Sequence, residues 1–410
     1  MKKILSTLLI VTMLFSLAAC GNTSKPASTA PTASGAATAS SSPAASEPAG
    51  KEATGEPVLF GVSVMDTGSQ AASGIFMRKA VTMAVEEINA NGGVLGGRPL
   101  EFIIDDNGTT PTGAVTVANK MLSQGIVASV GPHTSPMVAS AMEYYKEEGI
   151  PFISAATSPA LLEAENPYFF RISVSDGSVG QVMVKFAAEK FGAKKIASLF
   201  AADDYGIAAD NASKAFAESN GIEYYSEGMN ETDTDITSQL LKIKEWGPDV
   251  IFLFTHITDS ALALRQINEL GISENIPVVG PNALPMQQTL DLLDGSQVNG
   301  IYASTDFFAD TSNPLIKDFL GRFAARWEGT VAERIASMYY SSTYLLADAI
   351  DRAGSDDPEA IRNALAETKG LETVVGNLNC SDKLELNSNV YILKFDEKKN
   401  STVSQKVSLD

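Results

Sequence analysis

The sequence predicts an α/β protein with mainly parallel sheets and two lobes. From Pro57 onward, short apolar runs alternate with longer segments whose apolar residues recur at helical spacing. This alternation is typical of strand–helix–strand units that build parallel sheets. The body that follows Pro57 is roughly 350 residues long, which is too long for one α/β core, so we expect two lobes.

The strands and helices follow from the same pattern. Eight apolar runs are predicted as strands, at residues 58–64, 100–105, 126–130, 151–154, 196–200, 250–254, 277–279 and 301–304. The segments between them are predicted as helices, the clearest at residues 74–90, 205–219 and 260–270. Glycine follows the first and the third of these helices, where it is a common stop signal.

The first twenty residues predict a secretory signal peptide. Two lysines precede an apolar run, and small residues then lead to Cys20. The "LAAC" that ends at Cys20 resembles a bacterial lipobox, in which cleavage leaves the cysteine as a lipidated N-terminus. An ordinary signal peptide with a chance cysteine is the alternative. Residues 21–56 are nearly all Ala, Ser, Thr, Pro and Gly, and we expect them to form a disordered tether.

Cysteine content and charge narrow the class further. If Cys20 carries lipid, Cys380 has no partner for an intramolecular disulfide. The 30 basic and 49 acidic residues give a net charge of −19. An acidic body argues against a nucleic-acid partner and against wide contact with anionic lipid. An ordinary solvated surface explains the charge equally well.

Two loops rich in hydroxyl groups follow neighbouring predicted strands. One reads "VGPHTSP" and ends at Pro136, and the other reads "SAATSP" and begins at Ser154. Loops at the carboxyl ends of parallel strands are the place where open α/β sheets bind ligands. We therefore expect the two loops to lie close together at one edge of the sheet.

The chemistry of these loops leaves two interpretations open. Ser135 and Ser158 are good N-cap residues, and the prolines that follow them suit a first helical turn. Capping leaves Thr134, Thr157 and several backbone N–H groups without a role. Because a helix N-terminus attracts anions, capture of a carboxylate or phosphate is the second interpretation.

Motifs for other chemistries are missing or weak. The sequence contains no nucleophile elbow, no phosphate-binding P-loop and no H-E-x-x-H zinc motif. His133 and His256 both follow predicted strands and could lie in one cleft, although loop histidines with satisfied hydrogen bonds are the alternative. No cysteine stands near either histidine, so we expect no metal site, no cofactor and no catalytic residues.

Five stretches share both their sequence character and their order with one family of proteins. They read "AVEEINANGGVLGGRPLEFIIDDN", "VGPHTSP", "GIPFISAATSPALLEAENPYFFRI", "GAKKIASLFAADDYG" and "YLLADAIDRAGS". Together they resemble the leucine/isoleucine/valine-type solute-binding proteins of ABC transporters. The resemblance implies the type I periplasmic binding protein fold, with two Rossmann-like lobes joined by a three-strand hinge. The first lobe would comprise residues 57–174 plus 304–376, and the second would comprise residues 175–303 plus 377–410.

The same resemblance implies a ligand site in the cleft between the lobes. Members hold the α-carboxylate of an amino acid with hydroxyl and N–H groups of the first lobe. The matching and flanking positions here are His133, Thr134, Ser135, Ala155, Ala156 and Thr157. Tyr205 and His256 would face the ligand from the second lobe. A cradle of dipoles and hydroxyls avoids the desolvation cost of a buried lysine or arginine.

Two departures from the family pattern bear on the identity of the ligand. An acid that commonly holds the ligand's ammonium group is replaced by Asn282, and a common aromatic residue is replaced near Ser73. We expect Asp204, Asp259 or Asp306 to be able to supply the missing charge. The ligand could therefore be a different amino acid, an amide or another small carboxylate.

These observations predict a solute-binding lipoprotein rather than an enzyme. We expect a monomer anchored outside the cytoplasm by Cys20 that closes around its ligand and delivers it to an ABC permease. A sensor subunit that presents its ligand state to a membrane receptor is the first alternative. A secreted hydrolase is the second, and it would need an acid–base or nucleophilic set that the sequence does not display.

Overall fold

The protein is described here from a computed structural model, which describes residues 53–387 and 389–409. The predicted signal peptide, Cys20 and all but the last four residues of the predicted tether lie outside the described residues. Within the described part of the chain, no helix has the length and apolar character that crossing a membrane requires. Cys380, the one cysteine in that part, is unpaired.

The first lobe is built on a five-stranded parallel sheet with the order β2-β1-β3-β4-β5. Its strands are β1 (Val58–Val64), β2 (Leu100–Asp106), β3 (Ser129–Val130), β4 (Phe152–Ser154) and β5 (Phe169–Arg171). Its helices are α1 (Ala71–Ala90), α2 (Pro111–Ser123), α3 (Ser135–Glu147), α4 (Ala160–Glu163), α11 (Pro314–Arg326), α12 (Arg334–Ala353) and α13 (Pro358–Ala366). A short hairpin of β11 (Leu371–Thr373) and β12 (Gly376–Leu378) lies against α12.

The second lobe is built on a seven-stranded sheet with the order β14-β13-β10-β9-β8-β6-β7. The parallel strands are β6 (Lys195–Ala201), β7 (Glu223–Met229), β8 (Val250–Phe254), β9 (Val278–Gly280) and β10 (Tyr302–Thr305). The antiparallel strands β13 (Asn389–Phe395) and β14 (Ser401–Ser408) complete one edge. The helices are α5 (Asp176–Phe191), α6 (Asp204–Ser219), α7 (Thr237–Trp246), α8 (Ile257–Glu269), α9 (Gln287–Asp291) and α10 (Gly295–Val298).

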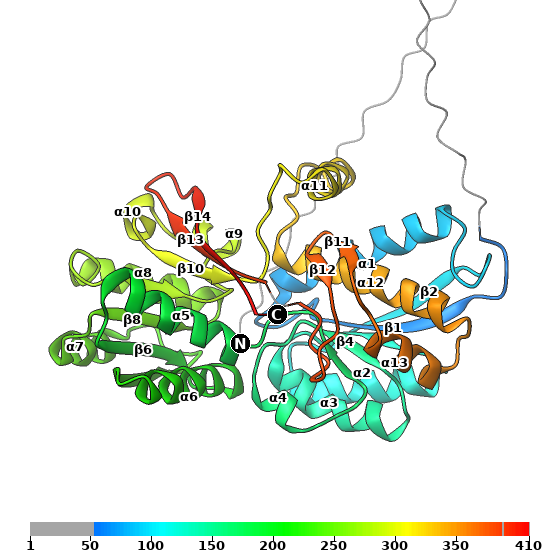
Figure 1. Cartoon of the computed structure of the whole chain (residues 1–410), viewed down its shortest axis with the longest axis horizontal. Coiled ribbons are helices and arrows are strands. Elements are labelled where there is room, and N and C mark those ends of the chain that lie inside the picture. The colour runs from blue at the N-terminus through cyan, green and yellow to red at the C-terminus, as the bar shows by residue number, and fades with distance from the viewer. Residues whose placement is uncertain (1–52, 388, 410) are drawn as a thin grey trace, which may run out of the picture. The chain divides into compact units, whose positions relative to one another are not determined.

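Hydrophobic residues fill both faces of each sheet. In the first lobe, α1 and α12 pack with β1 in one core, whereas α2 and α3 cover the other face. Two further cores lie on the two faces of the second sheet, and Figure 1 shows helices on both sides of it. Burial on both faces explains why the central strands are continuous apolar runs rather than alternating ones.

The chain passes between the two sheets three times, after β5, after β10 and after β12. The predicted α/β fold, with two parallel-sheet lobes joined by three crossing segments, is therefore confirmed. Since the loops that follow β1, β3, β4, β6, β8 and β9 end parallel strands, each lobe presents its strand ends to the cleft.

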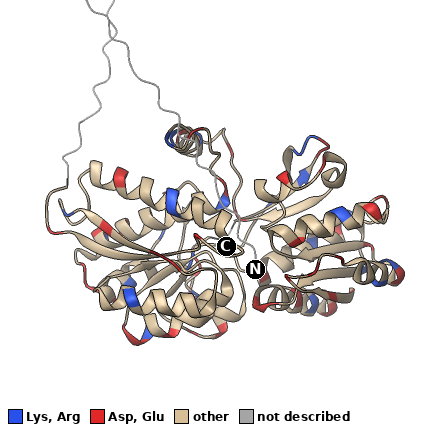
Figure 2. Ribbon diagram, turned by 180° about the vertical axis from the view of Figure 1, so that it is seen from behind, with Lys and Arg blue, Asp and Glu red and all other residues tan. Residues whose placement is uncertain are grey.

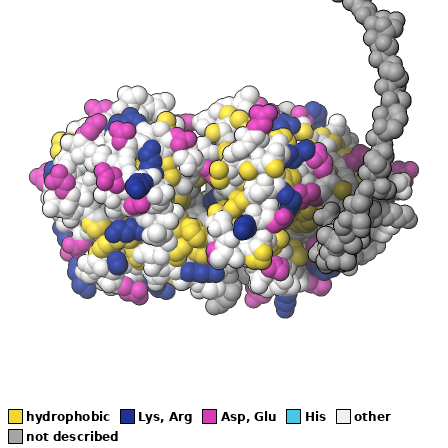
Figure 3. Space-filling view, turned by 90° about the horizontal axis from the view of Figure 1, so that it is seen from above, with side chains coloured by type: hydrophobic (Ala, Val, Ile, Leu, Met, Phe, Trp, Pro, Cys, Tyr) yellow, Lys and Arg dark blue, Asp and Glu magenta, His cyan; other side chains and the backbone are white. Residues whose placement is uncertain are grey.

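Charged residues lie mainly on the helices and loops that face solvent. Basic and acidic residues are interspersed over both lobes rather than gathered by sign (Figure 2). On the face seen from above, hydrophobic side chains form small groups between charged ones (Figure 3). This surface provides no basic stripe of the kind that tracks a nucleic-acid backbone on the faces in view.

Candidate ligand-binding site

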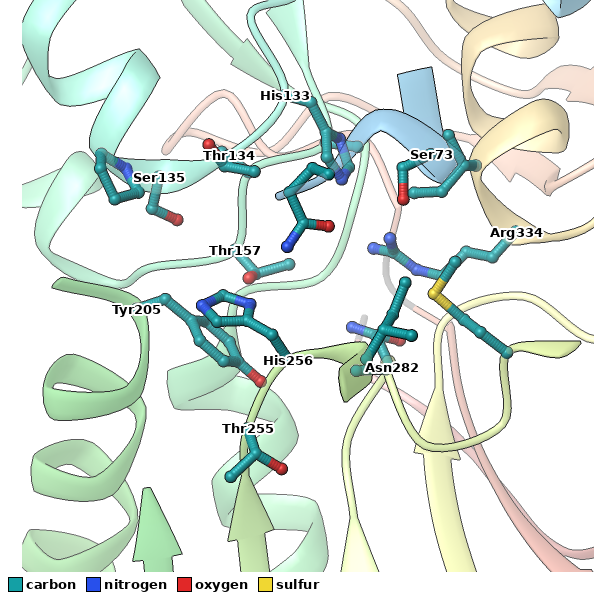
Figure 4. Close-up of a pocket in the computed structure, with 18 residues that line it drawn as sticks. Ser73, His133, Thr134, Ser135, Thr157, Tyr205, Thr255, His256, Asn282 and Arg334 are labelled. Carbon is teal, nitrogen blue, oxygen red and sulfur yellow. The ribbon is translucent and has the colours of Figure 1, made fainter. Parts of the chain in front are cut away.

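The strand-end loops of both lobes enclose a cavity of about 90 Å³. Figure 4 shows loop residues of the first lobe on one side and Tyr205, Thr255 and His256 of the second lobe on the other. The volume is small compared with the roughly 300–1,000 Å³ of pockets for drug-sized ligands. All nine predicted ligand-binding residues line this one cavity, namely His133, Thr134, Ser135, Ala155, Ala156, Thr157, Tyr205, His256 and Asn282.

The two hydroxyl-rich loops are bonded to each other. The Ser135 hydroxyl accepts a hydrogen bond of 3.1 Å from the N–H of Ser158, its counterpart in the other loop. Ser154 donates to the Pro132 carbonyl at 2.6 Å and accepts from the N–H of Ala156 at 3.1 Å. The repeated hydroxyls therefore fix the loops against one another and fix the direction in which their N–H groups point.

This arrangement corrects the predicted caps. Thr134, not Ser135, occupies the N-cap position of α3, and Ser135 is the first helical residue. Ser158 caps no helix, because α4 begins at Ala160 after Pro159, and its buried hydroxyl has no partner. The capping interpretation gave both serines the role of N-cap, whereas the serine of the first loop binds the second loop.

One glycine positions the first loop. Gly131 follows β3 with φ of +87°, a conformation that favours glycine. A Cβ at this position would lie 2.6 Å from the Ser63 carbonyl oxygen. The close approach lets the chain turn at once from β3 toward His133 and α3.

The joined loops leave a set of donors without partners. Neither the backbone N–H of Ser135 nor that of Thr157 donates a hydrogen bond within the described residues. The buried hydroxyl of Thr134 is likewise without a partner. The N-terminus of α3 adds its dipole to these donors. Together they form a binding site for an anion that uses no positively charged side chain. The Thr157 hydroxyl interacts with Asp176. We call this hydroxyl, together with the N–H groups of Ser135 and Thr157, the donor cradle.

An acid stands beside the donor cradle. Asp176, the first residue of α5, is fully buried, and its N–H donates to the Thr157 carbonyl at 2.8 Å. Its carboxylate, which does not line the cavity, interacts with the Thr157 hydroxyl and has no other hydrogen-bond partner among the described residues. Burial raises the pKa of Asp176 to about 6, although Thr157 and Arg171 offset part of the rise. The carboxylate also interacts with the ring of Tyr205, which lines the cavity.

His133 is neutral in the cavity wall. Its Nδ1 lies 3.0 Å from the hydroxyl of Tyr339, and the two rings meet edge to face. Burial, assisted by the charges of Arg334 and His256, lowers the pKa of His133 to about 3. His133 therefore contributes a dipole to the site and no charge at neutral pH.

The second lobe contributes a paired histidine and a tyrosine. His256 Nε2 lies 2.6 Å from the Asp203 carboxylate, and the Tyr205 ring lies 5.0 Å from the His256 ring between centroids. Burial lowers the pKa of His256, but the hydrogen bond and charge of Asp203 outweigh it and raise the pKa above its usual value. His256 therefore has a hydrogen-bond partner within the protein, as one of the two interpretations of the sequence expected. It also lines the cavity, as the other interpretation expected.

The far end of the cavity contains an arginine that was not predicted. Arg334, the first residue of α12, bonds the Asp306 carboxylate through Nε at 2.5 Å and through Nη2 at 2.9 Å. Figure 4 shows its side chain reaching toward the middle of the cavity between Ser73 and Asn282. Asn282 accepts from the N–H of Asp306 at 3.3 Å, and its buried Nδ2 has no partner. We call Asn282, Met286, Arg334 and Ile335 the distal end of the cavity.

None of the three acids proposed as substitutes for the missing charge lines the cavity. Asp306 is committed to Arg334, Asp204 is exposed on α6, and Asp259 is buried away from the cavity. Asp176 was missed, although "SVSDGS" is a further hydroxyl-rich loop before a helix. Arg334 was also missed. A basic residue in the first turn of a helix is unfavourable next to the helix dipole. Its presence there is the sequence feature that could have indicated an acidic partner.

The described residues offer no obvious metal centre. Among residues 53–387 and 389–409, no group of three or more His, Cys, Asp or Glu side chains is arranged to hold a metal ion. The polar "NETDTD" segment forms a turn in which the N–H of Asn230 bonds Asp233 at 2.8 Å, and α7 follows it. That segment is therefore a polar turn that precedes a helix rather than a cation site.

A cavity between two α/β lobes that are joined by three crossing segments is typical of a protein that binds a small solute. The chain belongs to the family described as periplasmic binding protein, whose model matches residues 57–400. Members of this family bind solutes outside the cytoplasm and do not transform them. The predictions of a non-enzyme and of an extracytoplasmic location are confirmed at this level.

Individual relatives support the same assignment. A leucine-, isoleucine-, valine-, threonine- and alanine-binding protein of Pseudomonas aeruginosa is 30% identical over 322 residues, covering 78% of this chain and 84% of the relative. A Streptococcus pneumoniae branched-chain amino acid binding protein, solved with isoleucine, is 26% identical with a TM-score of 0.76, covering 86% of this chain and 99% of that one. A leucine-binding protein of Thermotoga maritima, 22% identical with a TM-score of 0.79, shares the fold and covers 86% and 99% of the two chains.

Proposed function

We propose that this protein captures a small α-amino acid in the cleft and delivers it to the permease of an ABC importer. The observation that carries the proposal is the fully buried carboxylate of Asp176, which makes no salt bridge within the described residues, beside the donor cradle. An α-amino acid is a zwitterion whose carboxylate and ammonium groups are two bonds apart. The donor cradle complements the first group, and Asp176 complements the second.

The energetics favour a ligand that brings both charges. An anion alone would place a second negative charge beside Asp176, and the cradle offers only dipoles to offset it. A zwitterion supplies the ammonium that the buried carboxylate lacks. Charge-assisted hydrogen bonds of this kind are roughly twice as strong as neutral ones. The ammonium group would therefore offset the free-energy cost of burying the charged carboxylate, which is the cost that raises the pKa of Asp176.

Closure of the lobes is the mechanism we propose for retention. The first lobe supplies the donor cradle, and the second supplies Tyr205 and His256 to the cavity wall. Asp176 of the second lobe is bonded to Thr157 through its N–H and does not itself line the cavity. Only the closed form places both sets around the ligand, so the ligand shifts the population toward that form. One contact between the lobes is already present, because the N–H of Gln287 donates to Glu333 at 3.1 Å.

Thr157 provides the direct test. Full-length protein in detergent, stripped of carried ligand by partial unfolding and dialysis, would be titrated with the natural amino acids by calorimetry. Thr157→Val keeps the shape of the side chain and removes the hydroxyl, and we expect at least tenfold weaker binding, the cost of about one hydrogen bond to a charged group. Thr116→Val, at an exposed position on α2, is the matched control. If no amino acid binds, or if both variants bind equally, the proposal is wrong.

We also propose that Cys20 is lipidated and anchors the protein, as a monomer, outside the cytoplasm. The sequence alone supports this part, through the apolar run and the small residues that precede the cysteine. We expect Cys20→Ala to move the protein from the membrane fraction to the medium or periplasm. Membrane retention of the variant would contradict the anchor and leave the ligand proposal intact.

A further inference from the structure

The distal end of the cavity, where the side chain of an amino acid would lie, is unusual for an aliphatic ligand. Arg334 is the one arginine or lysine among the described residues that line the cavity. Asn282 adds an amide group, and Met286 and Ile335 add an apolar wall. Donors and apolar surface therefore occur together at this end.

Two donors at the distal end are free. Asn282 Oδ1 accepts from the N–H of Asp306, which orients the amide so that its Nδ2 points elsewhere, and this buried Nδ2 has no partner. Arg334 is nine-tenths buried and uses two of its three nitrogens on Asp306. The third nitrogen makes no hydrogen bond within the described residues. Buried donors without acceptors are unfavourable, so a ligand that supplies an acceptor gains affinity.

The charge of the distal end selects against an anionic acceptor. The Asp306 carboxylate already neutralises Arg334, and Arg171 is paired with Glu385. His133 is neutral at physiological pH. A side-chain carboxylate on the ligand would therefore add a negative charge near Asp306 with no unpaired cation to receive it. A buried uncompensated charge is far costlier than a buried neutral acceptor.

The size of the cavity limits the length of the ligand's side chain. The whole cavity, including the part for the carboxylate and ammonium groups, encloses about 90 Å³. Met286 and Ile335 at the distal end offer contacts for a methyl or methylene group. A short side chain with one apolar and one polar group fits this lining.

We propose that the distal end selects an α-amino acid with a short, uncharged side chain that carries a hydrogen-bond acceptor, a hydroxyl or an amide. The proposal rests on the proposed function, since it assumes that the donor cradle and Asp176 hold the amino acid. It differs from simple aliphatic selectivity, in which a side chain without polar atoms would be preferred.

Isosteric ligands provide the test. Threonine and valine have the same shape, as have asparagine, leucine and aspartate to a first approximation. Calorimetry on the stripped full-length protein should show threonine at least tenfold tighter than valine. Asparagine should likewise bind at least tenfold tighter than both leucine and aspartate, because sites built to bind a polar group strongly reject its apolar analogue.

A variant at Asn282 assigns the preference to the distal end. Asn282→Leu removes the free donor and keeps the volume, and we expect the threonine-to-valine ratio of affinities to fall at least fivefold. The ratio is informative because loss of the Asn282–Asp306 bond would weaken both ligands together. Asn211→Leu, on the exposed face of α6, is the matched control and should leave the ratio unchanged.

The outcomes separate this inference from the proposed function. If leucine or valine binds as tightly as its polar isostere, the inference is wrong and the amino-acid receptor stands. If aspartate binds more tightly than asparagine, Arg334 acts as a counter-charge and the inference is also wrong. If no amino acid binds at all, both proposals fall. The wild-type panel decides these cases even if Asn282→Leu fails to fold.

Discussion

Asp176→Asn should stabilise the ligand-free protein and abolish ligand binding. The carboxylate of Asp176 is fully buried, and this burial raises its pKa from 3.8 to about 6 although the Thr157 hydroxyl offsets part of the rise. A pKa that is higher in the folded state means that the folded protein binds the proton more tightly. Folding stability is therefore lost as the pH rises from about 4 to about 6.

The magnitude follows from the size of the shift. A rise of about two pKa units corresponds to about 3 kcal/mol at neutral pH. Asparagine removes this penalty but also loses a favourable interaction between an acid and the N-terminus of α5, worth about 0.3–1 kcal/mol. The net gain is roughly 2 kcal/mol. For a body of roughly 350 residues, with about 2.1 cal/mol/K of unfolding entropy each, the midpoint should rise by about 3 °C.

Thermal unfolding at pH 7.5 and pH 4, with and without ligand, measures both effects. The gain should be present at pH 7.5 and nearly absent at pH 4, where Asp176 is protonated in the wild type. Loss of a buried charged partner costs about 2–5 kcal/mol, so ligand affinity should fall roughly 30-fold or more. Asp204→Asn is the matched control, because Asp204 is likewise the first residue of a helix but is exposed.

The comparison with the control decides the reasoning. Asp204→Asn should lower stability slightly and leave binding within about twofold, since it loses only the interaction with the helix dipole. If Asp176→Asn is no more stable than Asp204→Asn at pH 7.5 and binds the ligand normally, Asp176 is neither a strained acid nor the ammonium partner.

Two further predictions concern the contact between the lobes and the loop that holds His133. Burial, together with the charge of Asp291, raises the pKa of Glu333 to about 7, so ligand-free stability should fall as the pH rises from about 4.5 to 7. Glu333→Gln keeps an acceptor for Gln287 and should flatten this dependence in thermal scans; an unchanged pH profile would contradict the assignment. Gly131→Ala should cost at least about 2 kcal/mol of stability, because positive φ and contact with the Ser63 carbonyl add together. Gly192→Ala has a positive φ and open space, so denaturant titration should show a cost of only about 1 kcal/mol, and equal costs would exclude the steric contribution.

The sequence predicted eight of the ten parallel strands that the structure describes and missed β5, β7, the β11–β12 hairpin and the antiparallel pair β13 and β14. All eight predicted strands are present, because a strand covered on both faces is a continuous apolar run. The edge strand β7, which reads "EYYSEGM", is half-buried and mixes polar with apolar residues. The antiparallel strand β14 alternates between intermediate and exposed residues and lacks an apolar run altogether. Its place depends on pairing with β13, which no local pattern reveals.

Some residues of the site could be predicted from local sequence, and others depend on contacts between distant parts of the chain. Loops that end parallel strands meet at one sheet edge by topology, so Ser135 and Thr157 could be placed together from their positions alone. Asp176 begins a helix directly after the first crossing segment, and Arg334 is held by Asp306 of the second crossing segment. Their meeting depends on the way the crossing segments fold, and a single sequence carries no direct record of it.

Asp306 shows how that long-range arrangement connects the cavity to the crossing segments. It lies in the second segment, accepts from the N–H of Val174 in the first at 3.0 Å, and its carbonyl accepts from Asn387 of the third at 3.1 Å. The same carboxylate holds Arg334, which lines the cavity. A ligand that bonds Arg334 therefore acts on the residue at which all three segments meet. Because the lobes can move only through these segments, the distal end of the cavity is the place where the ligand's side chain can influence closure as well as affinity.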